Sequence, residues 1–475
     1  MGNENITVRN ITTTPLRLKE VQRFHAPPVA SDPIGNFTST VANVTTAIGL
    51  TNNVTRAPVT RLGDDVKPFS SENVDIEIPP FKSVPTNIKP WVHDDKERII
   101  LTFETNLGGR HKMFCPVPTA NGSHELVPEA ANPKFKFTGI YLPKSSWVAL
   151  FSSANLHAWM KELPNDTPLG ALSIPGTHNS PTCHAAPPSV RCQAVSPKEQ
   201  LVNGVRFFDV RVQPESADDE NNDKLILVHS VFPISLTGTK YFRDLYNTIL
   251  DFLKANPSET LILSIKREGT GNATDEHLSK ILKRHYTNPE HWYTEPAGPD
   301  LGKVRGRIVL LRRFNNDPSL KDTWGPGRGW GIDCATWADN TPDSTCPSGW
   351  ARVQDFYNIT DTSLLDQKVK YAQALCDGSG CCSYEAGQVR GQGASKVPFF
   401  INFLSASNFF KISEWPEKIA HKMNPAMVEW LCKNHMQGNK PGDWSTGIIV
   451  TDWEGLGGDW DLTRVIVGYN AKLLK

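Results

Sequence analysis

The chain has 475 residues, of which 39% are hydrophobic and 21% charged, and its length predicts two domains rather than one core. Lysine plus arginine number 50, as do aspartate plus glutamate, so no overall basic field attracts nucleic acid and we expect no nucleic-acid partner. No run of about 18 consecutive apolar residues occurs, so we also expect no transmembrane segment.

The first residues, MGNENITVRN, lack the basic start and apolar core of a secretory signal. We therefore expect a cytoplasmic protein, peripheral to a membrane. Secretion by a route without such a signal stays open, because Asn-X-Ser/Thr sequons such as those at Asn5 and Asn272 would suit a secreted protein. The oligomeric state is open as well.

Residues 1–154 have the pattern of a β-rich accessory domain. Segments such as VDIEIPPF (74–81), RIILTFET (98–105) and FTGIYLP (137–143) are rich in β-branched residues with rough alternation, and clusters of Pro, Gly and Asn separate them. This pattern predicts a β-sandwich-like domain. The small and polar residues of 30–53 predict a long loop.

Residues 155–475 alternate strand-like runs with helical stretches, which predicts an α/β domain with parallel strands. Residues 238–259 carry apolar side chains about one helical turn apart, which predicts a helix. We expect a TIM-type (β/α) barrel, complete or slightly irregular; a flat doubly wound sheet also fits, but no GxGxxG follows the first strand. The predicted strands are 171–176, 205–212, 224–230, 260–267, 306–314, 398–405 and 446–453.

Polar side chains gather at the carboxyl ends of these strands. His178 follows the first strand, Arg211 lies in the second, and His229 closes the third. In a parallel barrel these ends meet at one mouth, where the active site lies. The same argument places Asp209, Lys266, Arg267, Arg312, Arg313 and Asp452 there.

Two histidines, a carboxylate and several cations at one mouth indicate a reaction at a phosphate ester. One imidazole can deprotonate a hydroxyl while the other protonates a leaving alkoxide. Guanidinium and ammonium groups can hold the phosphate. Each residue alone is weak evidence, since a single histidine at a strand end is more often structural; their joint placement carries the prediction.

Several blocks of the chain resemble, in order, those of the bacterial-type phosphatidylinositol-specific phospholipase C family. They include NDTPLGALSIPGTHNS, QLVNGVRFFDVRV, LILVHS, ETLILSIKREG, INFLSAS and GIIVTDWE, and they cover roughly residues 155–470. Residues 1–150 have no counterpart in the bacterial catalytic module and resemble the additional N-terminal β region of fungal members.

The resemblance implies a TIM barrel, often incompletely closed, that cleaves the glycerol–phosphate bond of an inositol phospholipid. The products would be diacylglycerol and a cyclic inositol phosphate, because the 2-hydroxyl of the inositol is the nucleophile. The substrate would be phosphatidylinositol or a glycosylated inositol lipid, taken from a phospholipid membrane surface. Which of these lipids it takes cannot be read from the sequence.

By motif, the resemblance makes His178 the general base and Asp452 the carboxylate that orients it. His229 would be the general acid, and Arg211 would neutralise the phosphate. Asp209 would support Arg211 or the acid. The positions that would hold the inositol ring are Lys266, Arg313, Asp355 and Tyr357.

Two positions depart from the bacterial pattern. Asn179, which we assign to the substrate-binding set, replaces an aspartate that sets the protonation of the acid histidine, and Ser230 replaces a glycine. Calcium-dependent relatives carry asparagine at the first position as a metal ligand, but they have a carboxylate where this chain has Arg211. Calcium needs six to eight oxygen ligands, so we expect no metal and no cofactor; calcium at Asn179 and Asp209 is the weaker alternative.

Two other functions stay open. The barrel could bind phospholipids or inositol phosphates without catalysis, although such a module has no reason to keep an acid, a base and an orienting carboxylate. It could instead be a metal-dependent phosphodiesterase, although the carboxylates that would surround magnesium near His178 are missing. Loss of activity in a chelator would favour the metal-dependent alternative.

The nine cysteines include a pair, Cys183 and Cys192, that brackets a short loop after His178. Two or three local disulfides are possible, with a connectivity that cannot be read from sequence. No paired CxxC motifs indicate structural zinc.

Aromatic residues around the mouth are candidates for lipid contact. We favour Trp324, Trp330 and Trp337 over the segment 141–163, whose Trp147, Phe151 and Trp159 fit domain packing better.

Overall fold

The computed structural model describes residues 4–25, 62, 65–116, 122–361, 363–384, 398–408, 410–438 and 440–474. The chain forms two compact units, Met1–Ser153 with Gly455–Asp461 and Ala154–Glu454 with Leu462–Lys475. The predicted loop 30–53 lies outside the described residues. Across the described ranges, no helix has the length and apolar character needed to cross a membrane.

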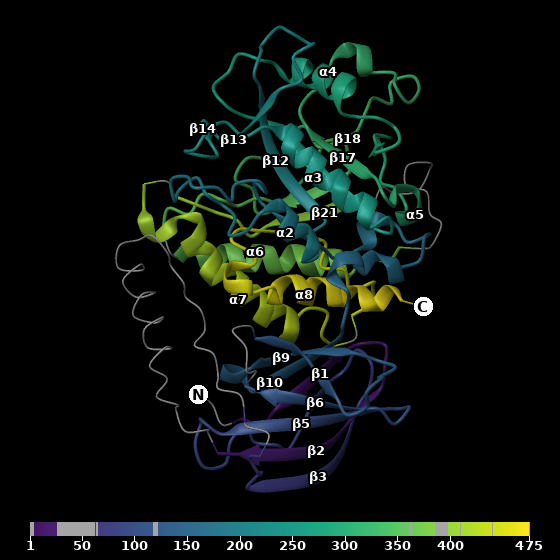
Figure 1. Ribbon diagram of the computed structural model, residues 1–475, viewed down its shortest axis with the longest axis vertical. Coiled ribbons are helices and arrows are strands. Elements are labelled where there is room, and N and C mark those ends of the chain that lie inside the picture. Colours follow the sequence, from purple (N-terminus) through teal and green to yellow (C-terminus); the bar gives the residue numbers. More distant parts are fainter. Residues whose placement is uncertain are drawn as a thin grey trace. The chain divides into compact units, whose positions relative to one another are not determined.

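The first unit is the predicted β-sandwich. Figure 1 shows its two layers, and each is a five-stranded sheet, with the orders β4-β1-β10-β9-β7 and β3-β2-β5-β6-β8. Val8 and Val148 from one sheet share a buried core with Leu18 and Leu101 from the other. The strands are β1 (Thr7–Ile11), β2 (Leu16–Phe24), β3 (Ser70–Ile78), β4 (Ser83–Pro85), β5 (Arg98–Thr105), β6 (Arg110–Cys115), β7 (Ser123–Glu125), β8 (Val127–Pro128), β9 (Phe137–Leu142) and β10 (Trp147–Ser152).

The second unit is built around a curled, mostly parallel sheet of order β16-β17-β15-β12-β11-β22-β21-β20-β19. Its central strands are buried on both faces, which explains their nearly continuous apolar sequences. In the described part of the chain, the first and last strands of this order, β16 and β19, do not pair with each other, so the barrel is incompletely closed. The strands are β11 (Ile174–Thr177), β12 (Phe207–Pro214), β15 (Leu261–Arg267), β16 (Trp292–Tyr293), β17 (Ile308–Arg313), β18 (Ile332–Asp333), β19 (Ser344–Thr345), β20 (Ala351–Gln354), β21 (Phe399–Phe403) and β22 (Ile448–Thr451).

Helices follow the strands along the chain (Figure 1). The predicted helix is confirmed as α3 (Phe242–Ala255), which buries Phe242, Leu245, Ile249 and Phe252 on one face. α6 (Ser363–Gly380) lies against β20 and β21. The other helices are α2 (Pro197–Val202), α4 (Asp275–His285), α5 (Leu301–Val304), α7 (Pro416–Lys433) and α8 (Asp461–Gly468), with 3₁₀ turns at Pro143–Ser145, Leu156–Glu162, Leu169–Ala171, Pro318–Leu320, Ile412–Glu414, Leu456–Gly458 and Tyr469–Leu473.

The third predicted strand does not belong to the parallel ladder. β13 (Leu225–His229) pairs antiparallel with β12, with Val212 opposite Leu227, and continues into the short β14 (Phe232–Pro233). The reason is the length of the connection: residues 215–224 are too few for a crossover to a parallel neighbour, which takes about a dozen or more residues. The expectation that His229 ends a parallel strand is therefore wrong, and the chain instead folds back along β12 to place it.

Candidate active site

A cavity of about 560 Å³ opens at the carboxyl ends of the parallel strands. This is the edge of a parallel barrel where active sites lie. Eight of the ten predicted site residues line it: His178, Arg211, His229, Lys266, Arg313, Asp355, Tyr357 and Asp452. The other two, Asn179 and Asp209, are fully buried behind it.

His178 stands directly after β11, where the strand turns sharply. Asn179, the next residue, has a positive φ of 37°, which turns the chain away from the sheet. His178 Nδ1 lies 2.9 Å from Asp452 Oδ1, and the Asp452 side chain is 2% exposed. Because this bond occupies Nδ1, the other ring nitrogen, Nε2, is left for chemistry.

The environment of His178 changes its acidity in two opposite directions. Burial lowers the pKa of His178, while the Asp452 carboxylate and Cys192 raise it, and the net result is a pKa well above the ordinary value. A buried carboxylate beside an imidazole stabilises the protonated ring. The pair is therefore suited to accept a proton.

His229 approaches His178 from the end of β13. The two ring centroids are 5.7 Å apart and the rings are nearly perpendicular, at 82°. His229 Nδ1 lies 2.7 Å from the Val190 carbonyl oxygen, so this nitrogen carries the proton of the neutral ring and donates it. Burial lowers the pKa of His229, Cys192 raises it and His178 lowers it, with a net increase.

Arg211 is a buried cation held by carboxylates. Its Nε donates to both Asp209 oxygens at 3.0 and 3.1 Å, and its Nη2 donates to Asp209 Oδ2 at 2.8 Å. Its Nη1 donates to Glu268, which also accepts from Lys266 Nζ at 2.9 Å. This network fixes the guanidinium at the cavity.

Asp209 acts through Arg211 and not at the cavity surface. Burial raises the pKa of Asp209, but Arg211 and Arg313 lower it to about 2. The carboxylate therefore stays ionised at neutral pH and holds both guanidinium groups.

Aromatic and acidic side chains also line the cavity. The Arg313 guanidinium carbon lies 3.6 Å from the centroid of the Trp337 ring, and Trp337 Nε1 donates to Asp355 Oδ2 at 3.1 Å. The Tyr357 hydroxyl donates to Asp339 at 2.9 Å, and its ring is 39% exposed. Arg313, Asp355 and Tyr357 thus lie together around an open space that can hold a polyhydroxylated ring.

Calcium does not fit the residues proposed for it. Asn179 is buried and donates through Nδ2 to the Val228 carbonyl at 3.3 Å. Both oxygens of Asp209 are bonded to Arg211. A guanidinium therefore occupies the place where a calcium ion would need charged oxygens.

Four residues of the site were missed in the sequence. Glu268, Cys192 and Asp339 were assigned no role at the cavity, and Trp337 was taken for a lipid contact. Glu268 stands two residues after Lys266 on the same block, KREG, so alternation along a strand could have placed both at the mouth. The role of Trp337 depends on Arg313, which is distant in sequence. Arg267 and Arg312, expected at the mouth, do not line the cavity.

The predicted lipid-contacting tryptophans are only partly where expected. Trp330 is fully buried, so that prediction is wrong, while Trp324 is 40% exposed. Phe151 and Trp159 are buried as expected for packing. Among the described residues of the second unit, the large apolar side chains with the highest exposed fractions are instead Phe410, Leu236, Ile412 and Val231, at 93%, 70%, 64% and 55%.

The chain resembles known proteins in both sequence and fold. Residues 165–314 match the family model described as phosphatidylinositol-specific phospholipase C, X domain. This stretch is similar to the X domain of that family. The matched stretch contains His178, Arg211, His229, Lys266 and Arg313, while Asp355, Tyr357 and Asp452 follow it in the chain.

Two relatives of this chain are bacterial proteins. The chain is 33% identical over 172 residues to a 1-phosphatidylinositol phosphodiesterase of Listeria monocytogenes, an alignment that covers 34% of this chain and spans half the length of that protein. It is 25% identical over 316 residues to a protein of the same name from Staphylococcus aureus, covering 62% of this chain and 88% of that one.

A solved mutant structure of the Staphylococcus aureus phosphatidylinositol-specific phospholipase C has a similar fold. It is 22% identical, with a TM-score of 0.51, and the match covers 66% of this chain and 98% of that one. At this identity the likeness concerns the fold alone.

Proposed function

We propose that this chain is a phosphatidylinositol phosphodiesterase of the phospholipase C type. The observation that carries the proposal is a pair of perpendicular histidines, one held by a buried carboxylate, beside a fixed guanidinium in a single cavity. The match to the X domain and the relatives named 1-phosphatidylinositol phosphodiesterase support the same activity.

The reaction needs one base, one acid and one anion-binding group. His178 removes the proton of the inositol 2-hydroxyl, and that oxygen attacks phosphorus to form the cyclic ester. The bond from phosphorus to the glycerol oxygen breaks. His229, protonated on both ring nitrogens, gives the proton on Nε2 to the leaving diacylglycerol alkoxide, while Nδ1 keeps its hydrogen bond to the Val190 carbonyl. Arg211 lies on the phosphate and stabilises the charge that develops there. No covalent enzyme intermediate forms, because the nucleophile belongs to the substrate.

The inositol ring occupies the space between Lys266, Arg313 and Asp355. Ammonium, guanidinium and carboxylate groups bond its hydroxyls, and the exposed face of Tyr357 stacks on the apolar face of the ring. The substrate is phosphatidylinositol or a glycosylated inositol lipid, since both present the same inositol phosphate. Asn179 supports the turn after His178 and does not line the cavity.

Phosphorus NMR of phosphatidylinositol vesicles with the purified protein in excess EDTA tests this function. We expect a cyclic inositol phosphate signal with wild type and none with His178→Ala. A signal that needs added calcium or magnesium would contradict the metal-free mechanism. No product with or without a metal would overturn the enzymatic function in favour of a binding module.

The substitution Asp452→Asn tests the origin of the acidity of His178. His178 must be neutral to act as a base, so kcat/KM falls as pH decreases through its pKa, which Asp452 raises. Removing that carboxylate lowers the folded pKa, and the acid limb of the kcat/KM profile should move to lower pH. The maximal rate should fall by about 10²-fold or more because the ring loses its orienting partner. An unmoved acid limb would show that another group titrates there.

Exposed apolar residues near the cavity suggest how the protein meets a lipid surface. Phe410 and Ile412 lie between two segments that line the cavity, 405–407 and Pro416. Each buried large apolar side chain contributes about 1.5–3 kcal/mol. This part of the chain can therefore enter a bilayer at the cavity.

We expect Phe410→Ala/Ile412→Ala to weaken vesicle binding by about tenfold or more. Sedimentation with phosphatidylinositol vesicles measures binding, and cleavage of a short-chain monomeric substrate should stay unchanged. Leu107→Ala, which changes a residue of the first unit that is 59% exposed, serves as the matched control. A greater loss for Trp324→Ala than for the double variant would support the tryptophan contact predicted from sequence instead.

A further inference from the structure

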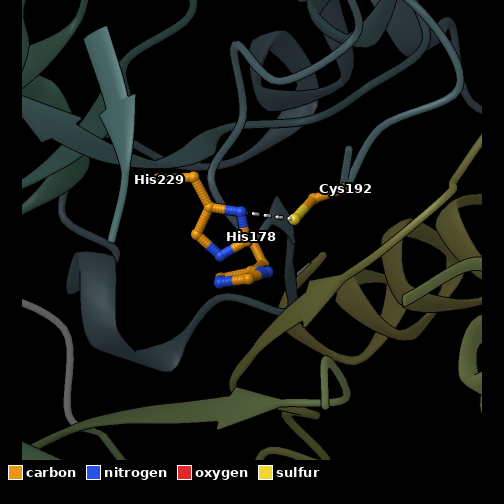
Figure 2. A group of neighbouring side chains, drawn as sticks. All are labelled: His178, Cys192 and His229. Atoms are coloured by element: carbon orange, nitrogen blue, oxygen red, sulfur yellow. Dashed lines mark hydrogen bonds between the residues drawn. The ribbon is translucent and has the colours of Figure 1, made fainter. Parts of the chain in front are cut away.

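Three potential metal ligands converge at the cavity. His178, Cys192 and His229 each offer one ligand atom, and these atoms all lie within 4.8 Å of one another. Figure 2 shows the three side chains pointing toward one another, with Cys192 Sγ 3.7 Å from His229 Nδ1. In the described part of the chain this is the only such group of histidine, cysteine and acidic side chains.

The supporting contacts are those that metal ligands usually have. His178 Nδ1 is bonded to Asp452, which leaves Nε2 as a ligand atom. A carboxylate behind a ligating histidine fixes its tautomer and raises its basicity. Cys192 is a free thiol, fully buried beside both imidazoles.

We propose that His178, Cys192 and His229 bind one borderline-soft divalent cation of the Zn²⁺ type, and that the bound ion inhibits the enzyme. Zinc takes tetrahedral nitrogen and sulfur ligands at about 2.0–2.3 Å, which separates two ligands by roughly 3.5 Å. Side-chain movements of about 1 Å would bring the three ligand atoms, now within 4.8 Å of one another, to this separation. The fourth position faces the cavity and takes water.

Inhibition follows from the atoms that the ion would use. A bound cation occupies the His178 nitrogen that removes the substrate proton and a ring nitrogen of His229. This part rests on the proposed function, whereas metal binding itself does not.

The charges around the cluster permit a cation. The carboxylates Glu268, Asp339, Asp355 and Asp452 and the cations Arg211, Lys266 and Arg313 line the cavity. The lining carboxylates outnumber the lining cations by one, and Asp452 directly contacts one of the ligands. Calcium and magnesium prefer oxygen ligands, so the nitrogen and sulfur donors select against them.

Direct metal titration tests the site without any activity measurement. We expect wild type to bind one Zn²⁺ in competition with a chromophoric chelator, and to bind neither Ca²⁺ nor Mg²⁺ there. Because loss of an outer-shell partner alone costs about 10- to 100-fold in metal affinity, Cys192→Ser should bind at least about tenfold more weakly. Cys183→Ser, which changes the other cysteine of the same loop, should bind as wild type does. Equal affinity of wild type and Cys192→Ser would overturn the site.

Cobalt substitution keeps the test independent of whether Cys192→Ser folds. Co²⁺ added to wild type should give the near-ultraviolet charge-transfer band of a thiolate ligand, and Zn²⁺ should abolish it. Absence of that band would also overturn the site.

Cleavage assays test the inhibition. Zn²⁺ should inhibit wild type at the concentration that fills the site, EDTA should restore the rate, and Cys192→Ser should need at least about tenfold more Zn²⁺ relative to its own zinc-free rate. Binding without inhibition, or stimulation by Zn²⁺, would overturn the inhibitory role. A protein that binds Zn²⁺ but has no activity in EDTA would contradict the proposed function and leave the metal site intact.

Discussion

Replacing His178 with alanine is expected to lower the rate of phosphatidylinositol cleavage by about 10²- to 10⁴-fold, the usual contribution of a positioned base. The reason is that the other described histidine lining the cavity, His229, is bonded to the Val190 carbonyl, whereas His178 has the Asp452 carboxylate at 2.9 Å. The rate is measured by release of cyclic inositol phosphate. The fold should persist, because His178 is partly exposed at the cavity and its removal leaves β11 intact.

The base and the acid can be told apart with a second substrate. An inositol phosphate ester of p-nitrophenol has a leaving group that needs no protonation. His229→Ala should therefore recover most of its activity on this ester, whereas His178→Ala should stay inactive, because the 2-hydroxyl must still lose its proton. His291→Ala, a half-buried histidine outside the cavity, is the matched control and should behave as wild type. Recovery by His178→Ala instead would reverse the two assignments.

The sequence allowed six parallel strands (β11, β12, β15, β17, β21 and β22) and α3 to be predicted, because burial on two faces and a helical repeat leave local patterns. The short β16, β18 and β20 were not predicted. The place of Phe242 and Ile249 on one buried face follows from spacing alone. The direction of β13 does not follow from spacing, because the short connection between β12 and β13 makes the two strands pair antiparallel. Counting residues 215–224 would have indicated the hairpin, but the apolar run of 224–230 looks the same in either direction.

The site could be predicted where function depends on residue type and strand end, as for His178 and Arg211. The site could not be predicted where the role of a residue depends on contact with another residue that is distant in sequence. Glu268 matters because Arg211 lies against it, and Trp337 because Arg313 stacks on it. Cys192 indicated a disulfide by its spacing from Cys183, yet both are free thiols. Its place between two imidazoles depends on the path of the loop that carries it.

The largest effect on stability is expected from the ion pair between Arg206, the residue before β12, and Glu259, which lies between α3 and β15. Both side chains are fully buried, and their charged atoms lie 2.9 Å apart. Arg206 also donates to the carbonyl oxygens of Leu201 and Val205 at 2.7 and 2.9 Å. Burial lowers the pKa of Arg206 to about 10, although Glu259 raises it. The guanidinium therefore depends on its partner to remain charged inside the protein.

Glu259→Gln should lower the free energy of unfolding of this unit by about 3–5 kcal/mol, because it leaves a buried charge without its counter-ion. Urea unfolding followed by tryptophan fluorescence measures this loss. Glu220→Gln is the matched control, since its pair with Lys280 is 40% and 37% exposed, and such pairs contribute roughly 0–1 kcal/mol. Equal losses in the two variants would mean that water reaches Arg206. A large loss confined to Glu259→Gln would instead show that this pair holds the start of β12, and with it Asp209 and Arg211, in place.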